Sequence, residues 1–147
     1  MGSIEKYRTL AQRVGLFQGL SPEDVGKIVA KGTTMRVAKG EVIFQQRTTG
    51  NTMFVILGGK VALSDDTKHL ATLGSGDMFG EMALISEQAR SATAIAAEDT
   101  RLFVLSEAVF HKLMTKRVAI QILLNIIGTL SKRLREANRK MGIFEGA

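Results

Sequence analysis

One glutamate and one arginine stand among small and apolar residues in the stretch GDMFGEMALISEQARSATAIA, residues 76–96. A charged side chain among residues suited to burial is costly unless it is paired or bound to a ligand. Arg90 offers a planar fork of N–H donors that matches a phosphate, and Glu81 offers acceptors for a sugar hydroxyl. The two residues therefore indicate either a salt bridge between strands or a site for a ligand that carries an anion and hydroxyls.

The residues around this pair favour the ligand. Gly80 allows close approach of a ligand to the backbone, and the small side chains of Ala83 and Ala92 leave space beside it. Other site chemistries find little support, because the chain has no cysteine and only two histidines, His69 and His111. A cluster of metal ligands or a nucleophilic catalytic set needs more such residues than this. We expect no catalysis, no metal and no cofactor.

The composition indicates a soluble, cytoplasmic globular protein. The chain has 147 residues, of which 45% are hydrophobic and 23% charged, and we expect a single domain over residues 1–147. The first residues lack the apolar segment of a signal peptide. The longest apolar-rich stretch, residues 118–127, is interrupted by Gln121 and Asn125 and is too short to span a bilayer, so we expect no membrane partner.

Helical patterns flank a long region of short strands. Residues 1–33 read as N-terminal helices, with Ser21 as a cap and Pro22 at the first helical position of the second. Residues 34–105 form short apolar runs separated by Gly and Asp, which is typical of an antiparallel sandwich or barrel. Residues 106–141 read as C-terminal helices that begin at Ser106. The fold class is therefore α+β and mainly β.

The long helix predicted from about residue 118 to 141 carries an apolar residue at both core positions of each turn of a seven-residue repeat. This seam comprises Ile120, Leu123, Ile127, Leu130, Leu134, Ala137 and Met141. Such a repeat favours pairing with a like helix, and hence a homodimer. The alternative is that the stripe packs on the protein's own strands. The same region, from Glu107 onward, carries eight Lys or Arg against three Glu, which we interpret as a solvated face rather than a nucleic-acid site.

The segments FGEMAL and RSATAIA, separated by five residues, resemble the phosphate-binding cassette of cyclic nucleotide-binding domains. This family includes the bacterial catabolite activator protein and the regulatory subunits of protein kinase A. The resemblance covers nearly the whole chain, since AKGEVIF, GNTMFVILGGKVAL and TRLFVLSEAVFHKLM are also similar to parts of the family.

The resemblance implies an antiparallel β-roll, a jelly-roll-like double-stranded β-helix, in which a cassette at residues 79–92 holds a 3′,5′-cyclic nucleotide. It also implies a hinged C-terminal helix that closes on the base. By position, Glu81 would bind the ribose 2′-hydroxyl and Arg90 the cyclic phosphate. The resemblance implies three further groups of binding residues. The phosphate would also contact Gly80, Met82, Ala83 and Ser91, and the ribose and base would be lined by Leu63, Ala71, Phe79 and Ala92. The last helix would contribute Arg133 and Asn138 to the contacts with the base.

The sequence departs from the family pattern at two positions. Arg47 stands where members usually have a glycine, so the turn before Gly50 is expected to differ in shape. Ala89 replaces the proline that often precedes the cassette arginine. Neither position is one of the two charged contacts, so the implied ligand is unchanged.

The expected function is a sensor, in which a bound cyclic nucleotide shifts the C-terminal helix. Cyclic AMP is favoured over cyclic GMP, because bacterial members most often use it; no residue of this chain decides the point. The sequence ends six residues after Met141, so a helix-turn-helix and sequence-specific DNA binding are not expected unless the protein is longer. The alternative is an interaction protein with a structural Glu81–Arg90 salt bridge and a basic helix for an acidic partner.

Overall fold

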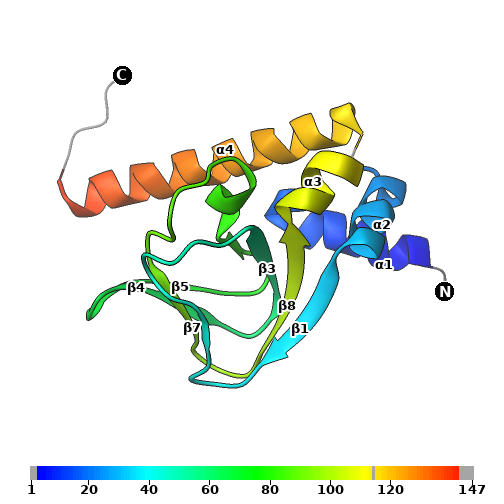
Figure 1. The fold of residues 1–147 in the computed structure, drawn as a ribbon. Coiled ribbons are helices and arrows are strands. Elements are labelled where there is room, and N and C mark those ends of the chain that lie inside the picture. Colours follow the sequence, from blue (N-terminus) through cyan, green and yellow to red (C-terminus); the bar gives the residue numbers. More distant parts are fainter. Residues whose placement is uncertain (1–2, 114, 143–147) are drawn as a thin grey trace.

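Two four-stranded antiparallel sheets form a roll, and helices from both ends of the chain pack beside it (Figure 1). The computed structural model describes residues 3–113 and 115–142. The strand order is β1–β8–β3–β6 in one sheet and β2–β7–β4–β5 in the other. The strands are β1 (Thr33–Val37), β2 (Val42–Phe44), β3 (Thr52–Gly58), β4 (Val61–Asp65), β5 (Lys68–Leu73), β6 (Met78–Phe79), β7 (Thr93–Ala96) and β8 (Thr100–Ser106). The predicted β-roll fold is confirmed.

Three of the four α-helices follow a residue whose hydroxyl accepts a hydrogen bond from a free backbone N–H group. They are α1 (Ser3–Arg13), α2 (Pro22–Lys31), α3 (Glu107–Leu113) and α4 (Lys116–Lys140), with short 3-10 helices η1 (Gly15–Phe17) and η2 (Glu81–Leu84). Ser21 caps α2 as predicted, since its hydroxyl accepts a hydrogen bond from the Asp24 backbone N–H at 3.2 Å. Helix α4 begins two residues before the predicted start, because Thr115 caps it by accepting from Val118 N–H at 3.3 Å.

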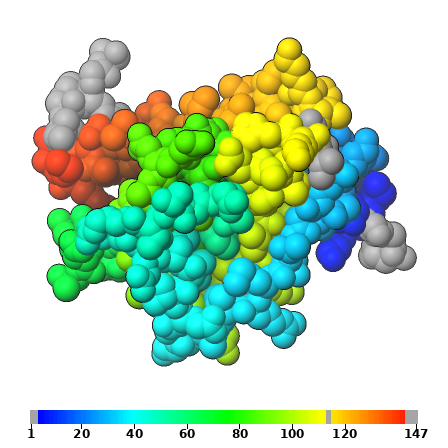
Figure 2. All heavy atoms as spheres, viewed as in Figure 1, coloured from blue at the N-terminus to red at the C-terminus, as the bar shows by residue number. Residues whose placement is uncertain are grey.

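Strand β3 is buried on both faces and separates two hydrophobic cores. Because side chains alternate along a strand, Phe54 and Ile56 point into the roll while Met53 and Val55 face the helices. The first core contains Val37, Val61, Phe79, Ala94, Ala96 and Leu102 as well. The second core is formed with α2, α3 and α4, and it fixes α4 along one edge of the roll (Figure 2).

The apolar residues of α4 divide between two faces in a way the predicted seam did not anticipate. Val118, Ile122 and Ile126 are buried in the helix-side core, and the seam residues Leu123 and Leu130 also pack against it. The exposed apolar residues are Ile120, Leu124, Ile127, Leu134 and Met141. Packing of α4 on its own roll therefore uses part of the predicted seam, and Leu124, which is outside that seam, lies on the exposed face.

An ion pair fastens α4 to α2. The Arg117 guanidinium donates to both carboxylate oxygens of Asp24, at 3.1 and 2.9 Å, and Asp24 is buried. Burial alone raises the pKa of Asp24, but the hydrogen bonds from Arg117 and Ser21 outweigh this effect and hold the pKa below its usual value. The ionised carboxylate therefore stabilises the fold above the pKa of the unfolded chain, near 3.9. This stabilisation is lost as the pH falls through the lower pKa of the folded state.

Asp24→Asn is accordingly expected to lower the free energy of unfolding by about 1 kcal/mol at pH 7, a modest value because Arg117 is largely exposed. The difference from the unchanged protein should persist to about pH 5 and diminish as the pH falls below the pKa of the unfolded chain, near 3.9, toward the lower pKa of the folded state. Urea unfolding at a series of pH values measures it. Glu23→Gln, which alters an exposed carboxylate in the same helical turn, is the control and should show no such pH dependence. A difference that stays constant into acid would show that Asp24 does not act through its charge.

Candidate functional site

A turn at Gly80 precedes Glu81 and leaves room for the Arg90 side chain. This glycine has a φ of 72°, a left-handed conformation that side chains disfavour, and it links β6 to η2, which begins at Glu81. A Cβ atom on Gly80 would also lie 2.8 Å from Nη1 of Arg90. Gly50 likewise leaves space for Arg90, because a Cβ atom added at Gly50 would collide with the guanidinium. Two glycines thus make room for one buried arginine.

The Arg90 guanidinium is held by neutral groups only. Its Nη1 donates to the Gly80 carbonyl at 3.2 Å and its Nη2 to the Thr52 carbonyl at 2.8 Å. The guanidinium carbon stacks 4.2 Å from the centre of the Phe44 ring. No carboxylate of the described residues lies within ion-pair distance, and Nε has no hydrogen-bond partner among them. Arg90 is therefore a buried cation whose charge and donors are only partly satisfied.

The pKa of Arg90 also indicates that its charge is incompletely compensated. Burial lowers the pKa of its guanidinium from the usual value, and the negative charge of Glu81 opposes this effect from beyond contact distance. A second anion beside the guanidinium would reduce the cost of burying the charge. The arrangement is suited to binding an anionic group.

Glu81 pairs with Arg133 of α4, not with Arg90. Arg133 donates to Oε1 of this buried carboxylate at 3.2 Å and to the Met78 carbonyl at 2.6 Å. The predicted alternative of a structural Glu81–Arg90 salt bridge is therefore wrong. Arg90 instead turns toward Thr52 and Gly80, because their carbonyl groups meet its donors.

The two charged residues line one cavity of about 230 Å³ between the roll and α4. Ten predicted residues line it, namely Leu63, Phe79, Gly80, Glu81, Met82, Ala83, Arg90, Ser91, Ala92 and Arg133. Phe79 stacks on Phe54 with ring centres 5.1 Å apart and forms a rigid apolar wall. The cavity therefore combines a cation, a carboxylate and apolar surface, which suits a ligand with a phosphate, a hydroxylated sugar and a flat ring.

Two predicted residues do not line the cavity, and four lining residues were not predicted. Ala71 lies on β5 opposite Leu63, and Asn138 lies beyond Arg133 on α4, outside the lining. The additional residues are Phe44, Gln88, Ala89 and Leu130. Leu130 was assigned to the helix seam, and its place at the cavity depends on how α4 packs, which the repeat does not reveal.

The turn at Arg47 has a backbone conformation that glycine favours. Arg47 adopts a φ of 70°, the left-handed conformation that glycine adopts without strain, and its guanidinium pairs with Asp66 at 2.6 Å. Its backbone N–H donates to the Arg90 carbonyl at 2.8 Å. The loop thus supports the backbone of Arg90 even without glycine.

Within the described residues, no helix is long and apolar enough to cross a membrane, and no group of three or more His, Cys, Asp or Glu residues is placed to hold a metal ion. His111 is exposed and contacts the Leu84 carbonyl at 3.2 Å.

Comparisons with known proteins give consistent results. The family model described as "Cyclic nucleotide-binding domain" matches residues 34–117. The "Cyclic AMP receptor protein" of Thermus thermophilus is 35% identical over 88% of this chain and 61% of its own length. The "cGMP-dependent protein kinase 2" of Mus musculus is 31% identical over 96% of this chain and 20% of its own length. The chain thus spans less than two thirds of these curated relatives.

A solved structure supports the fold. The crystal structure of a cyclic nucleotide-binding domain from Methylobacillus flagellatus matches with a TM-score of 0.81 at 22% identity, covering 99% of this chain and 88% of the other. At this level of identity the match bears on the fold alone, and it agrees with the β-roll and the long C-terminal helix described above.

Proposed function

The chain belongs to the cyclic nucleotide-binding domain family, and from this premise we propose that it is a non-catalytic sensor whose cavity binds cyclic AMP in preference to cyclic GMP. One observation carries the proposal: a buried Arg90, which has no ion-pair partner among the described residues, and a buried Glu81 line the same cavity of about 230 Å³. A cyclic nucleotide brings the anion that Arg90 needs and the hydroxyl that Glu81 accepts.

The proposed division of work follows from the donors and acceptors of each residue. Arg90 retains N–H groups beyond those given to Gly80 and Thr52, and these bind the cyclic phosphate. Glu81 engages Arg133 through Oε1, which leaves Oε2 free to accept from the ribose 2′-hydroxyl. Phe79, Leu63 and Ala92 give the sugar and base an apolar surface. The ligand therefore completes a polar network that the protein leaves partly open.

The preference for cyclic AMP rests on the relatives rather than on a contact. The cyclic AMP receptor protein is 35% identical over 134 residues, whereas the kinases named for cyclic GMP are 30 to 32% identical. A regulatory subunit named for cyclic AMP is 27% identical. The cavity itself offers Ser91 and Leu130 near the ligand, and neither chooses between the two bases. We therefore expect both nucleotides to bind and cyclic AMP to bind more tightly.

Isothermal titration calorimetry with cyclic AMP, cyclic GMP and 5′-AMP tests this function. We expect saturable binding of one cyclic AMP per chain, weaker binding of cyclic GMP, and at least tenfold weaker binding of 5′-AMP, a difference of about 1.4 kcal/mol. The open monophosphate keeps the base and sugar but changes the shape and charge of the phosphate. Absence of heat with both cyclic nucleotides at about 50 μM protein would exclude the proposed ligand.

Signalling is proposed to pass through Arg133. Beyond Leu130 the side chains of α4 are exposed or half-buried, and Arg133 ties this part of the helix to Glu81 and to Met78. A nucleotide that binds Glu81 shares its carboxylate with Arg133, so the ligand and α4 contact the same residue. Binding then shifts the balance between attached and detached positions of the helix end.

Arg133→Ala is expected to loosen the end of α4. Loss of two hydrogen bonds made by a charged group, one of them to a buried carboxylate, should accelerate amide exchange over residues 130–140 about 5- to 30-fold, or roughly 1–2 kcal/mol. Hydrogen exchange with mass spectrometry measures this change. Arg135→Ala removes an exposed cation from the same helix and should leave exchange unchanged. Equal exchange in all three proteins, or an α4 unaffected by cyclic AMP, would contradict the proposed route.

The exposed face of α4 supports a homodimer. Its apolar residues Ile120, Leu124, Ile127, Leu134 and Met141 are spaced by four, three, seven and seven residues, and Ser131 and Asn138 occupy the two intervening positions of a heptad repeat. This spacing is that of a coiled-coil seam, in which a polar residue such as Asn138 sets the register. We propose that two chains pair along this seam, which replaces the one predicted through Leu123 and Leu130.

A further inference from the structure

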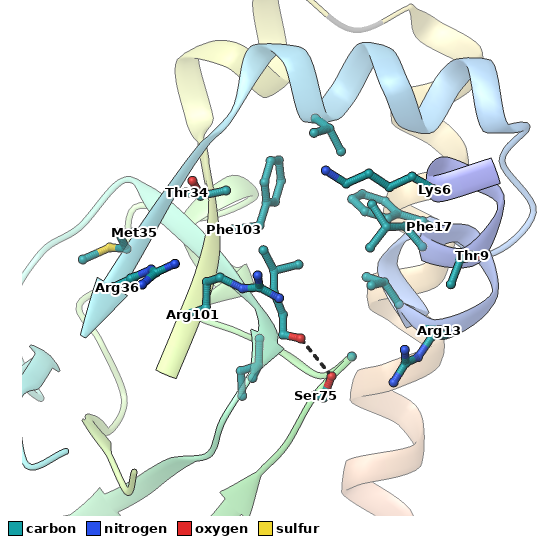
Figure 3. A pocket seen from close by; sticks show the side chains of 16 residues that line it. Lys6, Thr9, Arg13, Phe17, Thr34, Met35, Arg36, Ser75, Arg101 and Phe103 are labelled. Carbon is teal, nitrogen blue, oxygen red and sulfur yellow. Dashed lines mark hydrogen bonds between the residues drawn. The ribbon is translucent and has the colours of Figure 1, made fainter. Parts of the chain in front are cut away.

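A second cavity, larger than that of the cassette, lies between α1 and the sheet that contains β1 and β8 (Figure 3). Its volume is about 780 Å³, within the range of about 300–1,000 Å³ typical of ligand pockets. It shares no lining residue with the cavity around Glu81 and Arg90. The cyclic nucleotide of the proposed function therefore does not account for it.

Four cations line this cavity, and no acidic residue does. Lys6 and Arg13 come from α1, Arg36 from β1 and Arg101 from β8. None of the four forms an ion pair or a side-chain hydrogen bond with another described residue. In Figure 3 the side chains of Lys6 and Arg101 extend into the space between the helix and the sheet.

The positions of Arg36 and Arg101 make this concentration of charge unfavourable without an anion. The two residues are direct partners in the register of β1 and β8, so their side chains share one face of the sheet. Like charges placed directly opposite each other on neighbouring strands are destabilising. An anion between them would relieve the repulsion and accept hydrogen bonds from both guanidinium groups.

The remaining walls are largely apolar. Leu10 of α1 and Leu57 of β3 are half-buried in these walls. Behind them, Phe17 and Phe103 meet edge to face with ring centres 6.1 Å apart and close the base of the cavity. The cavity thus places an apolar base beneath a cationic rim. A highly charged ligand such as a polyphosphate would leave the apolar part unused.

We propose that this cavity is a second ligand site, which binds a small anionic amphiphile: an alkyl or aryl body that carries one carboxylate or phosphate. The apolar body occupies the base near Leu10 and Leu57, and the anion lies between Arg36 and Arg101, with Lys6 beside it. The site is separate from the nucleotide cavity and does not depend on the function proposed for it.

The test uses decanoate as the probe, with two partial mimics that separate its parts. Decanol keeps the chain without the charge, and acetate keeps the charge without the chain. Titration of the ¹⁵N-labelled protein should give saturable decanoate binding, at least tenfold tighter than that of decanol, with no detectable acetate binding. The shifted amide resonances should belong to α1, to residues 34–36 and to residues 101–103. Decyl phosphate should produce the same pattern if the site accepts both kinds of anion.

Charge reversal supplies the matched variants. Arg101→Glu should weaken decanoate binding at least tenfold, whereas Arg139→Glu, which makes the same charge change on an exposed position of α4, should alter it less than twofold. Lys6→Glu provides a second substitution in the cavity on a different element, should Arg101→Glu disturb the sheet. Equal affinity for decanol and decanoate, equal effects of the three substitutions, or shifts centred on residues 79–92 or on the exposed face of α4 would overturn the proposal.

Discussion

Arg90→Lys is expected to weaken cyclic nucleotide binding by roughly 100-fold, even though it keeps the positive charge. A lysine ammonium is a point charge without the planar fork that matches a phosphate, and it cannot also reach the Thr52 and Gly80 carbonyls that now position the guanidinium. Each hydrogen bond to a charged group contributes about 1.5–3 kcal/mol, so the loss of one or two accounts for the expected factor. Titration calorimetry with cyclic AMP measures the change.

The control for this substitution is Arg47→Lys. It makes the same chemical change in the neighbouring loop, on an exposed side chain whose partner is Asp66 and which does not line the cavity. Affinity should change less than twofold. Thermal unfolding of both variants separates binding from folding, because Arg90 also links three chain segments and its loss should lower Tm. An Arg90→Lys affinity within about tenfold of the unchanged protein would show that Arg90 does not hold the phosphate.

The cassette was predictable because its information is local. A glycine, a carboxylate, small residues and an arginine occur within 21 residues, and the cost of burying either charge points to a ligand or a pair. The partner of Glu81 was harder to predict, because Arg133 lies 52 residues further along and reaches Glu81 only through the packing of α4. Periodicity places Arg133 on a helix but does not give the position of that helix against the roll.

The cationic cavity has no local sequence signal at all. Lys6, Arg36 and Arg101 lie on three separate elements, and each alone reads as an ordinary exposed charge. Only the antiparallel register that sets Arg36 opposite Arg101 brings the charges together. Strand pairing at that distance in sequence is set by tertiary packing and not by a motif.

The two faces of α4 illustrate the same difficulty, because both are apolar and a repeat cannot tell which one is buried. Residues 118, 122 and 126 follow a spacing of four, whereas the exposed residues follow the heptad positions. The straight α-helix drifts relative to a seven-residue repeat, so a seam chosen from the sequence mixes the two faces. Leu123 and Leu130 were assigned to the partner on that basis, and they contact the protein's own core instead.

Ile126→Ala and Ile127→Ala test which face of α4 is buried, since the two residues are of the same type and adjacent, and only the first is buried. Ile126 is 0% exposed and Ile127 is 59% exposed. Removal of a fully buried isoleucine costs about 2–5 kcal/mol, a large part of the 5–15 kcal/mol that a domain of this kind has. Urea unfolding of a dilute sample, at about 1 μM, should therefore show a severe loss for Ile126→Ala and a change within about 0.5 kcal/mol for Ile127→Ala.

In concentrated samples, in which dimers form, Ile127 and not Ile126 should determine the affinity between the two chains. If two chains pair along the exposed seam, Ile127→Ala removes a central contact of the interface and should raise the dimer dissociation constant at least tenfold, or about 1.4 kcal/mol. Ile126→Ala should leave the association of the folded protein nearly unchanged, because its side chain faces the roll. Sedimentation equilibrium measures both constants. A dimer unaffected by Ile127→Ala would exclude the heptad face as its interface, and a monomer at all concentrations would exclude the dimer.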